Sequence, residues 1–100
     1  MILKQSAIAG APESGDVQVS VSPNPGEGIH IELKSSVKAR FGDAILETVR
    51  SELERFEITE ASVRLLDKGA LDCVIRSRLQ CAICRSAQVK YDWTWEDKTV

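Results

Sequence analysis

Ser14 is the residue of this chain whose surroundings are best suited to chemistry. It lies in the stretch Gly-Ala-Pro-Glu-Ser-Gly-Asp at residues 10–16, where Pro12 and Gly15 argue against regular structure and predict an accessible turn. A hydroxyl group on such a turn is open to modification by another enzyme. It is not an activated nucleophile, because no histidine lies within several residues and no nucleophile-elbow pattern surrounds it. From the residues alone, a turn serine that hydrogen-bonds its own backbone is the plain alternative.

The cysteines give only a weak motif. Cys81 and Cys84 form a C-x-x-C pair, and Cys73 precedes them. A structural zinc site needs four ligands, and the chain adds only one histidine, His30, which we interpret as a surface residue. A thioredoxin-like pair would begin a helix after a strand, which this pair does not. We therefore interpret all three cysteines as free thiols that face away from the apolar side of their helix.

Two further pairs of side chains are candidates for binding a partner. Arg78 and Arg85 share one side of a predicted helix and suit a phosphate or an acidic partner, although exposed charges of this kind are most often simply solvated. Trp93 and Trp95 alternate along a short aromatic tail and either cap the core or dock on another protein. No carboxylate pair, phosphate loop or catalytic triad is found elsewhere in the sequence.

Composition excludes several classes of function. The 100 residues are the size of one domain, 43% of them are apolar, and the net charge of −2 is evenly spread without a basic patch for nucleic acid. No apolar run approaches the roughly 20 residues of a membrane span. The first residues do not have the pattern of a signal peptide. An odd, small number of cysteines favours a reducing cytoplasm.

Periodicity predicts the elements that position these groups. Residues 17–21 and 29–33 alternate apolar and polar side chains, which predicts two strands antiparallel to each other, and a third strand is expected near residues 62–66. An apolar stripe at helical spacing predicts a helix from about residue 37 to about residue 56, with Ser35 or Ser36 as a cap; a later start capped by Asp43 is the alternative. The stripe consists of Phe41, Ile45, Val49, Leu53 and Phe56. Glu52 falls on this stripe without an explanation in the sequence beyond an edge position or an ion pair.

A second helix is predicted from Asp72, as its cap, to about Ala87. The competing interpretation makes residues 71–75 a fourth strand, paired through the turn at Lys68-Gly69. The order ββαβα predicts a single α+β domain over residues 1–100, with a three-stranded sheet and two helices packed on it. Residues 1–15 are expected to form a flexible arm that carries the serine, and residues 88–100 the aromatic tail.

Several of these pieces together resemble one family. Residues 9–17, Ala-Gly-Ala-Pro-Glu-Ser-Gly-Asp-Val, resemble the A-G-x-x-E-S-G-D-V start of citrate lyase acyl carrier proteins, the gamma subunit of that enzyme. Further segments follow the family's order and spacing: Ser35–Val37, Phe41–Ile45, Asp67–Cys73, Arg76–Leu79 and Trp95–Asp97. The likeness covers nearly the whole chain. The departures are the loop at residues 22–28, rich in proline and glycine, and Tyr91–Thr94 before the final Trp-Glu-Asp.

The resemblance implies a carrier without catalytic residues. In that family the serine matching Ser14 is joined through a phosphodiester to phosphoribosyl-dephospho-coenzyme A, which a dedicated transferase, holo-citrate lyase synthase, installs. The thiol of this group holds an acetyl group, which the alpha subunit (acyl transferase) exchanges for citryl. The beta subunit (citryl lyase) then cleaves the citryl thioester to oxaloacetate and regenerates the acetyl thioester, so that citrate is cleaved overall to acetate and oxaloacetate. A covalent arm makes both reactions intramolecular at high effective concentration.

Other functions compete with this one. The related carrier subunit of malonate decarboxylase uses the same kind of prosthetic group, and analysis of the bound acyl group would distinguish the two. A plain interaction module that docks through Trp93 and Trp95 would carry no covalent modification. A redox or metal protein built on Cys81 and Cys84 is the third alternative, which the metal content of the purified protein would test.

Overall fold

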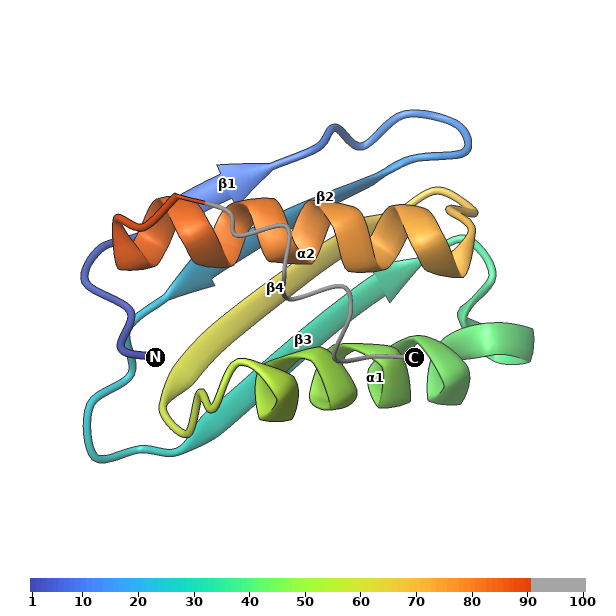
Figure 1. Cartoon of the computed structure of the whole chain (residues 1–100). Coiled ribbons are helices and arrows are strands. Elements are labelled where there is room, and N and C mark those ends of the chain that lie inside the picture. Colours follow the sequence, from blue (N-terminus) through green and yellow to red (C-terminus); the bar gives the residue numbers. More distant parts are fainter. Residues whose placement is uncertain (91–100) are drawn as a thin grey trace.

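Four strands and two helices make up the part of the chain that the structure describes, residues 1–90 (Figure 1). In this computed structural model the elements are β1 (Ala7–Ala9), β2 (Val17–Ser22), β3 (Ile29–Ser35), α1 (Lys38–Arg55), β4 (Ala61–Asp67) and α2 (Asp72–Ala87). The predicted α+β class is confirmed. The tail residues Trp93 and Trp95 lie outside the described residues. No helix within residues 1–90 is both long and apolar enough to cross a membrane.

The sheet has the order β1-β2-β4-β3, so β4 is inserted between the two strands that precede it in the sequence. β2 runs antiparallel to β4, from the pair Val17–Asp67 onward, and β3 runs parallel to β4, up to the pair Ser35–Asp67. β2 and β3 therefore run in opposite directions, as predicted, but they are not neighbours. The pairing of β2 with β4 and that of β3 with β4 both reach Asp67. The β1–β2, β3–α1 and β4–α2 connections therefore lie at the same end of the sheet.

The prediction of three strands was wrong by one. β1 is only three residues long, Ala-Ile-Ala, which is too short for a period of two to be recognised, and it joins the sheet by pairing antiparallel with β2. Residues before it are also attached to the domain: Leu3 is buried, and the backbone N–H groups of Lys4 and Gln5 donate to the Ser86 carbonyl at 3.0 and 3.2 Å. The early part of the predicted flexible arm is thus packed against the end of α2.

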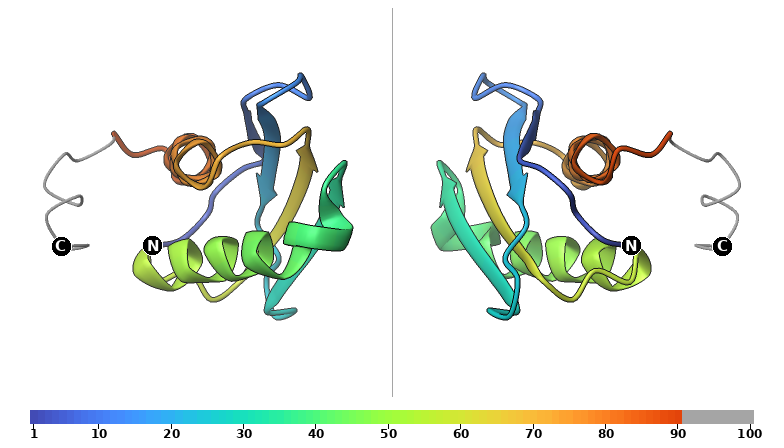
Figure 2. Two further views of the ribbon diagram at one scale, coloured as in Figure 1. Left: turned by 90° about the vertical axis from the view of Figure 1, so that its right-hand side faces the viewer. Right: turned by 90° about the vertical axis from the view of Figure 1, so that its left-hand side faces the viewer.

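The core lies between the sheet and the two helices. α2 packs on β1 and β2, α1 packs on β3 and on α2, and the other face of the sheet carries no helix in residues 1–90 (Figure 2). The inward strand positions are fully buried aliphatic side chains, and both helices contribute a buried stripe. Members of this core include Val17, Val19, Val21, Val49, Val63, Leu65, Leu79 and Ile83. Burial of each such side chain stabilises the fold by about 1.5–3 kcal/mol. The alternation in the sequence therefore determines which face of each strand turns toward the helices.

Both helices begin without the side-chain caps that the sequence suggested. The N-cap of α1 is Val37, whose N–H donates to the Ser35 Oγ at 3.1 Å, and the N-cap of α2 is Leu71. Asp72 lies one residue inside α2, where it binds other side chains instead of capping. The alternative of a strand over residues 71–75 is wrong, because this segment is helical.

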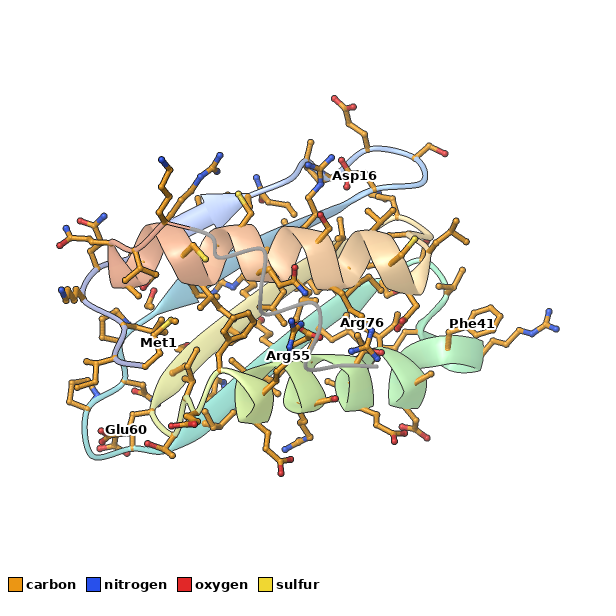
Figure 3. The ribbon with its side chains drawn as sticks, viewed as in Figure 1. Met1, Asp16, Phe41, Arg55, Glu60 and Arg76 are labelled. Atoms are coloured by element: carbon orange, nitrogen blue, oxygen red, sulfur yellow. The ribbon has the colours of Figure 1, made fainter. Side chains whose placement is uncertain are left out.

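Glu52 is a buried carboxylate that joins the two helices. Its side chain is almost fully enclosed, and its Oε1 accepts from Arg76 Nη1 at 2.9 Å. Its Oε2 accepts from Gln80 Nε2 at 3.1 Å and from Arg55 Nη1 at 3.3 Å. Figure 3 labels Arg55 and Arg76 in the space between α1 and α2. A carboxylate on the apolar stripe of α1 is thus explained by partners that lie 24 and 28 positions further along the chain.

We expect Glu52→Ala to destabilise the fold by about 2 kcal/mol, because it leaves Arg76 and Gln80 without their shared acceptor between the helices. Urea unfolding followed by circular dichroism measures the change in midpoint. Glu54→Ala is the matched control, since Glu54 is on the same helix and exposed, and it should change stability by less than about 0.5 kcal/mol. Equal effects of the two substitutions would contradict a bridging role for Glu52.

Candidate functional site

Ser14 lies in the connection from β1 to β2, which extends past the ends of those strands (Figure 1). The Asp16 N–H donates to the Glu13 carbonyl at 2.9 Å and closes a turn, with Ser14 in its middle. Residues 12–15 are all exposed, as the sequence predicted for Ser14. Among the described residues the Ser14 hydroxyl makes no hydrogen bond, so the plain alternative of a self-bonded turn serine is not observed. The hydroxyl is free to react with an incoming group.

The base of this turn is bonded to the connection between β4 and α2. The Gly15 N–H donates to the Lys68 carbonyl at 2.8 Å, and the Lys68 N–H donates to the Asp16 carbonyl at 3.0 Å. These two bonds extend the β2–β4 ladder one step past the Val17–Asp67 pair. Ser14 is therefore an exposed residue on a fixed base.

Arg78 of α2 provides a second attachment. Its Nε and Nη2 donate to Asp16 Oδ1 and Oδ2, both at 3.1 Å, in a bidentate pair. Asp16 Oδ1 also accepts the Val17 N–H at 2.7 Å. The hydrogen bond from Arg78, followed by that from Val17, holds the pKa of the Asp16 carboxyl below its usual value. Figure 3 labels Asp16 at the base of the Ser14 turn.

Gly10 forms the neck of the same connection, the point at which its backbone packs closely against Val17 and Arg78. It has φ of +80°, and a Cβ built there would lie 2.0 Å from the Val17 carbonyl oxygen and 3.1 Å from Arg78 Cδ. Gly15 also has a positive φ, +78°, but a Cβ there would meet nothing within 4 Å. Glycine at position 10 is thus required both by the backbone conformation and by close packing. The turn is therefore closely packed at Gly10 and open at Gly15.

The other candidate residues do not converge on Ser14. His30 is exposed and pairs with Ser62 at the start of β4, so it lies roughly 20 Å along that strand from Lys68 and cannot act as a base. Arg85 Nη1 donates to the Ile8 carbonyl at 2.7 Å. Both predicted surface arginines, Arg78 and Arg85, are therefore bound to the β1–β2 segment of their own chain.

The three cysteines differ in exposure. Cys73 is exposed and Cys81 is partly buried, but Cys84 is buried, which corrects the expectation that all three face away from the core. The buried side of α2 is wider than one stripe because the helix contacts α1 as well as β1 and β2. Burial is the main reason that the pKa of the Cys84 thiol is raised. No cluster of three metal-binding side chains is found within residues 1–90.

Sequence reasoning located the turn but missed what holds it. The Lys68 backbone bonds to Gly15 and Asp16 from a distant part of the chain, and the carboxylate–guanidinium pair of Asp16 and Arg78 joins positions 62 residues apart. Neither periodicity nor motif spacing signals such a contact. Arg78 was noted as a candidate for binding an acidic group, and that group proves to be within the same chain.

The two glycines give a matched test of the neck. We expect Gly15→Ala to cost about 1 kcal/mol, the price of a left-handed conformation alone. Gly10→Ala should cost roughly 2 kcal/mol more, because the new methyl group would overlap the Val17 carbonyl. Thermal and urea unfolding of both variants measure the difference. Equal stability of the two variants would show that the neck is not closely packed.

The Asp16–Arg78 pair also predicts a pH dependence. Because the pKa of Asp16 is lowered in the folded chain, the pair is fully formed above the ordinary value of 3.8 and is lost as the pH falls through the lowered pKa. Carboxyl-carbon NMR should show the Asp16 titration moving up toward 3.8 in Arg78→Gln. Arg50→Gln, at an exposed position on α1, is the control and should leave it in place. An unchanged titration in Arg78→Gln would contradict the assignment of Arg78 as the main cause of the lowered pKa of Asp16.

Comparisons with known proteins agree with the resemblance noted from the sequence. Residues 4–86 match the family model described as ACP, malonate decarboxylase delta subunit (MdcD). The citrate lyase acyl carrier protein of Streptococcus mutans serotype c is 45% identical over 94 residues, covering 93% of this chain and 92% of the relative. The citrate lyase acyl carrier protein of Oenococcus oeni is 43% identical over 96 residues, covering 96% and 98%.

A solved structure shares the fold. A chain in the crystal structure of a Pseudomonas malonate decarboxylase hetero-tetramer in complex with malonate matches with a TM-score of 0.68 and 21% identity, over 85% of this chain and 91% of that chain. At this identity the match supports the architecture alone. From the sequence relatives and the family model, the chain belongs to the citrate lyase acyl carrier protein family and is a non-catalytic carrier.

Proposed function

We propose that this protein is the acyl carrier subunit of a citrate lyase complex and that Ser14 carries phosphoribosyl-dephospho-coenzyme A through a phosphodiester bond. The observation that carries the proposal is an unbonded, exposed serine on a turn fixed to β4, in a chain whose relatives are named citrate lyase acyl carrier proteins. When bound, the group supplies the thiol that holds an acetyl or citryl group as a thioester. The free cysteines fit a reducing compartment, and we place the complex in the cytoplasm.

The residues around Ser14 fit such a group. A phosphodiester is negatively charged, and of the two carboxylates that flank Ser14, that of Asp16 is neutralised by Arg78, whereas that of Glu13 is exposed to solvent. A Cβ built at Gly15, the residue next to Ser14, would meet nothing within 4 Å, so the turn is open on that side. No side chain near the hydroxyl can deprotonate it, so the base must come from the transferase, holo-citrate lyase synthase.

The partners follow from the same role. A carrier needs one enzyme that loads acyl groups and one that cleaves them, which in the proposed complex are the alpha (acyl transferase) and beta (citryl lyase) subunits. A covalent tether keeps the thioester close to both active sites at high effective concentration. The part of the chain that the structure describes supplies the attachment point and a fixed base for it, and the chemistry of cleavage belongs to the partners.

Two alternatives are weaker. A carrier for malonate decarboxylase is favoured by the family description and by the fold of the Pseudomonas structure, but that match is 21% identical, against 43–45% for the citrate lyase relatives. Analysis of the acyl group on the loaded thiol distinguishes the two. A non-carrier interaction module would carry no covalent group at all.

Intact-mass spectrometry of protein from cells that express the transferase should show one added phosphoribosyl-dephospho-coenzyme A. Peptide mapping should place it on the peptide containing Ser14, and Ser14→Ala should lose it completely. Ser22→Ala is the matched control, because Ser22 lies at the end of β2, where its hydroxyl is hydrogen-bonded to that of Ser6 at 3.0 Å. This control should be modified to the same extent as the unaltered chain.

Two outcomes would count against the proposal. An increment that persists in Ser14→Ala, or that maps to Ser6, Ser20 or Ser22, would show that the attachment residue is different. A chain that is never modified in the presence of an active transferase would exclude the carrier function in this form.

A further inference from the structure

An apolar groove opens between the first turns of the two helices, at the same end of the sheet as Ser14. It encloses about 290 Å³. Val37, Phe41 and Ala44 line one wall, and Ala70, Leu71 and Ile75 line the other. Phe41 is 46% exposed and Leu71 is 71% exposed, so both walls present a large apolar side chain to solvent. Phe41 was predicted on the buried stripe of α1, but Figure 3 shows it projecting from the outer end of that helix.

The groove is directly connected to the Ser14 turn. Its second wall begins at Gly69, which follows Lys68, and Lys68 is hydrogen-bonded through both its N–H and its carbonyl to that turn. β2 and β4 are neighbouring strands, about 4.8 Å apart, and their last pair is Val17–Asp67. A group attached to Ser14 therefore starts one strand spacing away from the connection that forms the groove wall.

The chemistry of the groove selects what it can hold. Among the described residues that line it, Asp72 alone is charged, and Thr48 Oγ1 donates to Asp72 Oδ1 at 2.6 Å. Arg76 Nε donates to the other oxygen at 2.7 Å, and Thr48 and Arg76 together keep the pKa of Asp72 below its usual value. The lining thus offers aliphatic and aromatic surface with a carboxylate at one side. It suits methyl groups and amides, and it offers no cation among its described lining residues to a ligand that carries carboxylates.

We propose that this groove binds the pantetheine part of the arm on Ser14, together with an acetyl group on its thiol, between transfers; this rests on the proposed function. The pantetheine unit combines a pair of methyl groups with two amides, which matches apolar walls beside hydrogen-bonding Thr48 and Asp72. The volume of the groove is close to the lower limit of ordinary small-molecule sites, about 300 Å³. Attachment to Ser14 removes most of the entropic cost of binding, so a shallow groove is sufficient.

Under this proposal, docking of the arm in the groove depends on the acyl group that its thiol carries. An acetyl group adds one methyl to the apolar contact, so the acetylated arm docks and its thioester is shielded from water. A citryl group would bring carboxylates against apolar walls whose lining residues, within the described chain, offer no cation to pair with them. Burial of unpaired charge is costly, so the citryl-loaded arm is released. The groove would thus retain the acetylated arm and release the citryl-loaded arm.

The test uses the ¹⁵N-labelled full chain in apo, free-thiol holo and acetyl-holo forms, with intact mass recorded for each sample. We expect the amide signals of Ala44, Gly69 and Leu71 to shift on loading, more for the acetyl form than for the free thiol. In Ala44→Trp, which fills the groove from an exposed position, these shifts should be lost at Gly69 and Leu71. Ala39→Trp, also exposed on α1 but outside the groove, is the matched control and should keep them.

Each result separates this inference from the proposed function. Samples in which the mass confirms loading on Ser14 but the groove signals do not move would overturn the inference and leave the carrier function intact. Groove shifts that appear only on adding the alpha or beta subunit would assign the groove to a partner protein. Shifts in the apo chain that grow with its concentration would assign it to a second copy. A mass that never increases defeats both.

Discussion

A buried carboxylate at the end of β4 determines how this end of the molecule is built. Asp67 is 2% exposed, its Oδ2 accepts from Ser35 Oγ at 2.6 Å, and its Oδ1 accepts from the Ala70 N–H at 2.9 Å. Its backbone carbonyl accepts the Ser36 N–H at 3.2 Å. An enclosed carboxylate is tolerated only when such donors surround it. These donors belong to the segments that lead into α1 and α2, so one residue fixes where both helices begin.

The position of β4 extends this constraint across the sheet. Because β4 pairs with β2 on one side and β3 on the other, its end is where the β1–β2 turn, the β3–α1 junction and the β4–α2 connection meet. Lys68, the next residue, supports the Ser14 turn through its backbone alone. Ser14 and the apolar groove are thus placed by the same two residues, Asp67 and Lys68, and neither contributes a side chain to the proposed chemistry.

Local patterns predicted what local forces determine. The first helix was expected at residues 37–56 and runs Lys38–Arg55, and the second runs over the expected residues, because each buries an apolar side at helical spacing. Strand pairing could not be predicted from such local patterns, because the insertion of β4 and the pairing of the three-residue β1 depend on contacts between distant segments. The same reason explains why the partners of Glu52 and Asp16 were not found. Exposure of Ser14 followed from Pro12 and Gly15, whereas the group that we propose for it came only from the family resemblance.

The fixed base of the Ser14 turn changes how a carrier of this kind must work. Four hydrogen bonds, two with Lys68 and two with Arg78, hold the base, and Gly10 closes the neck behind it. Little of the reach between two partner active sites can then come from movement of residues 10–16. Under the proposed function that reach must come from the prosthetic group itself, pivoting on a nearly stationary serine. The two active sites must therefore lie within one arm length of Ser14, and effective concentration at each depends on the length of the arm and not on a long polypeptide linker. A fixed pivot also gives the arm a constant path to the groove beside Gly69, which a mobile segment would not provide.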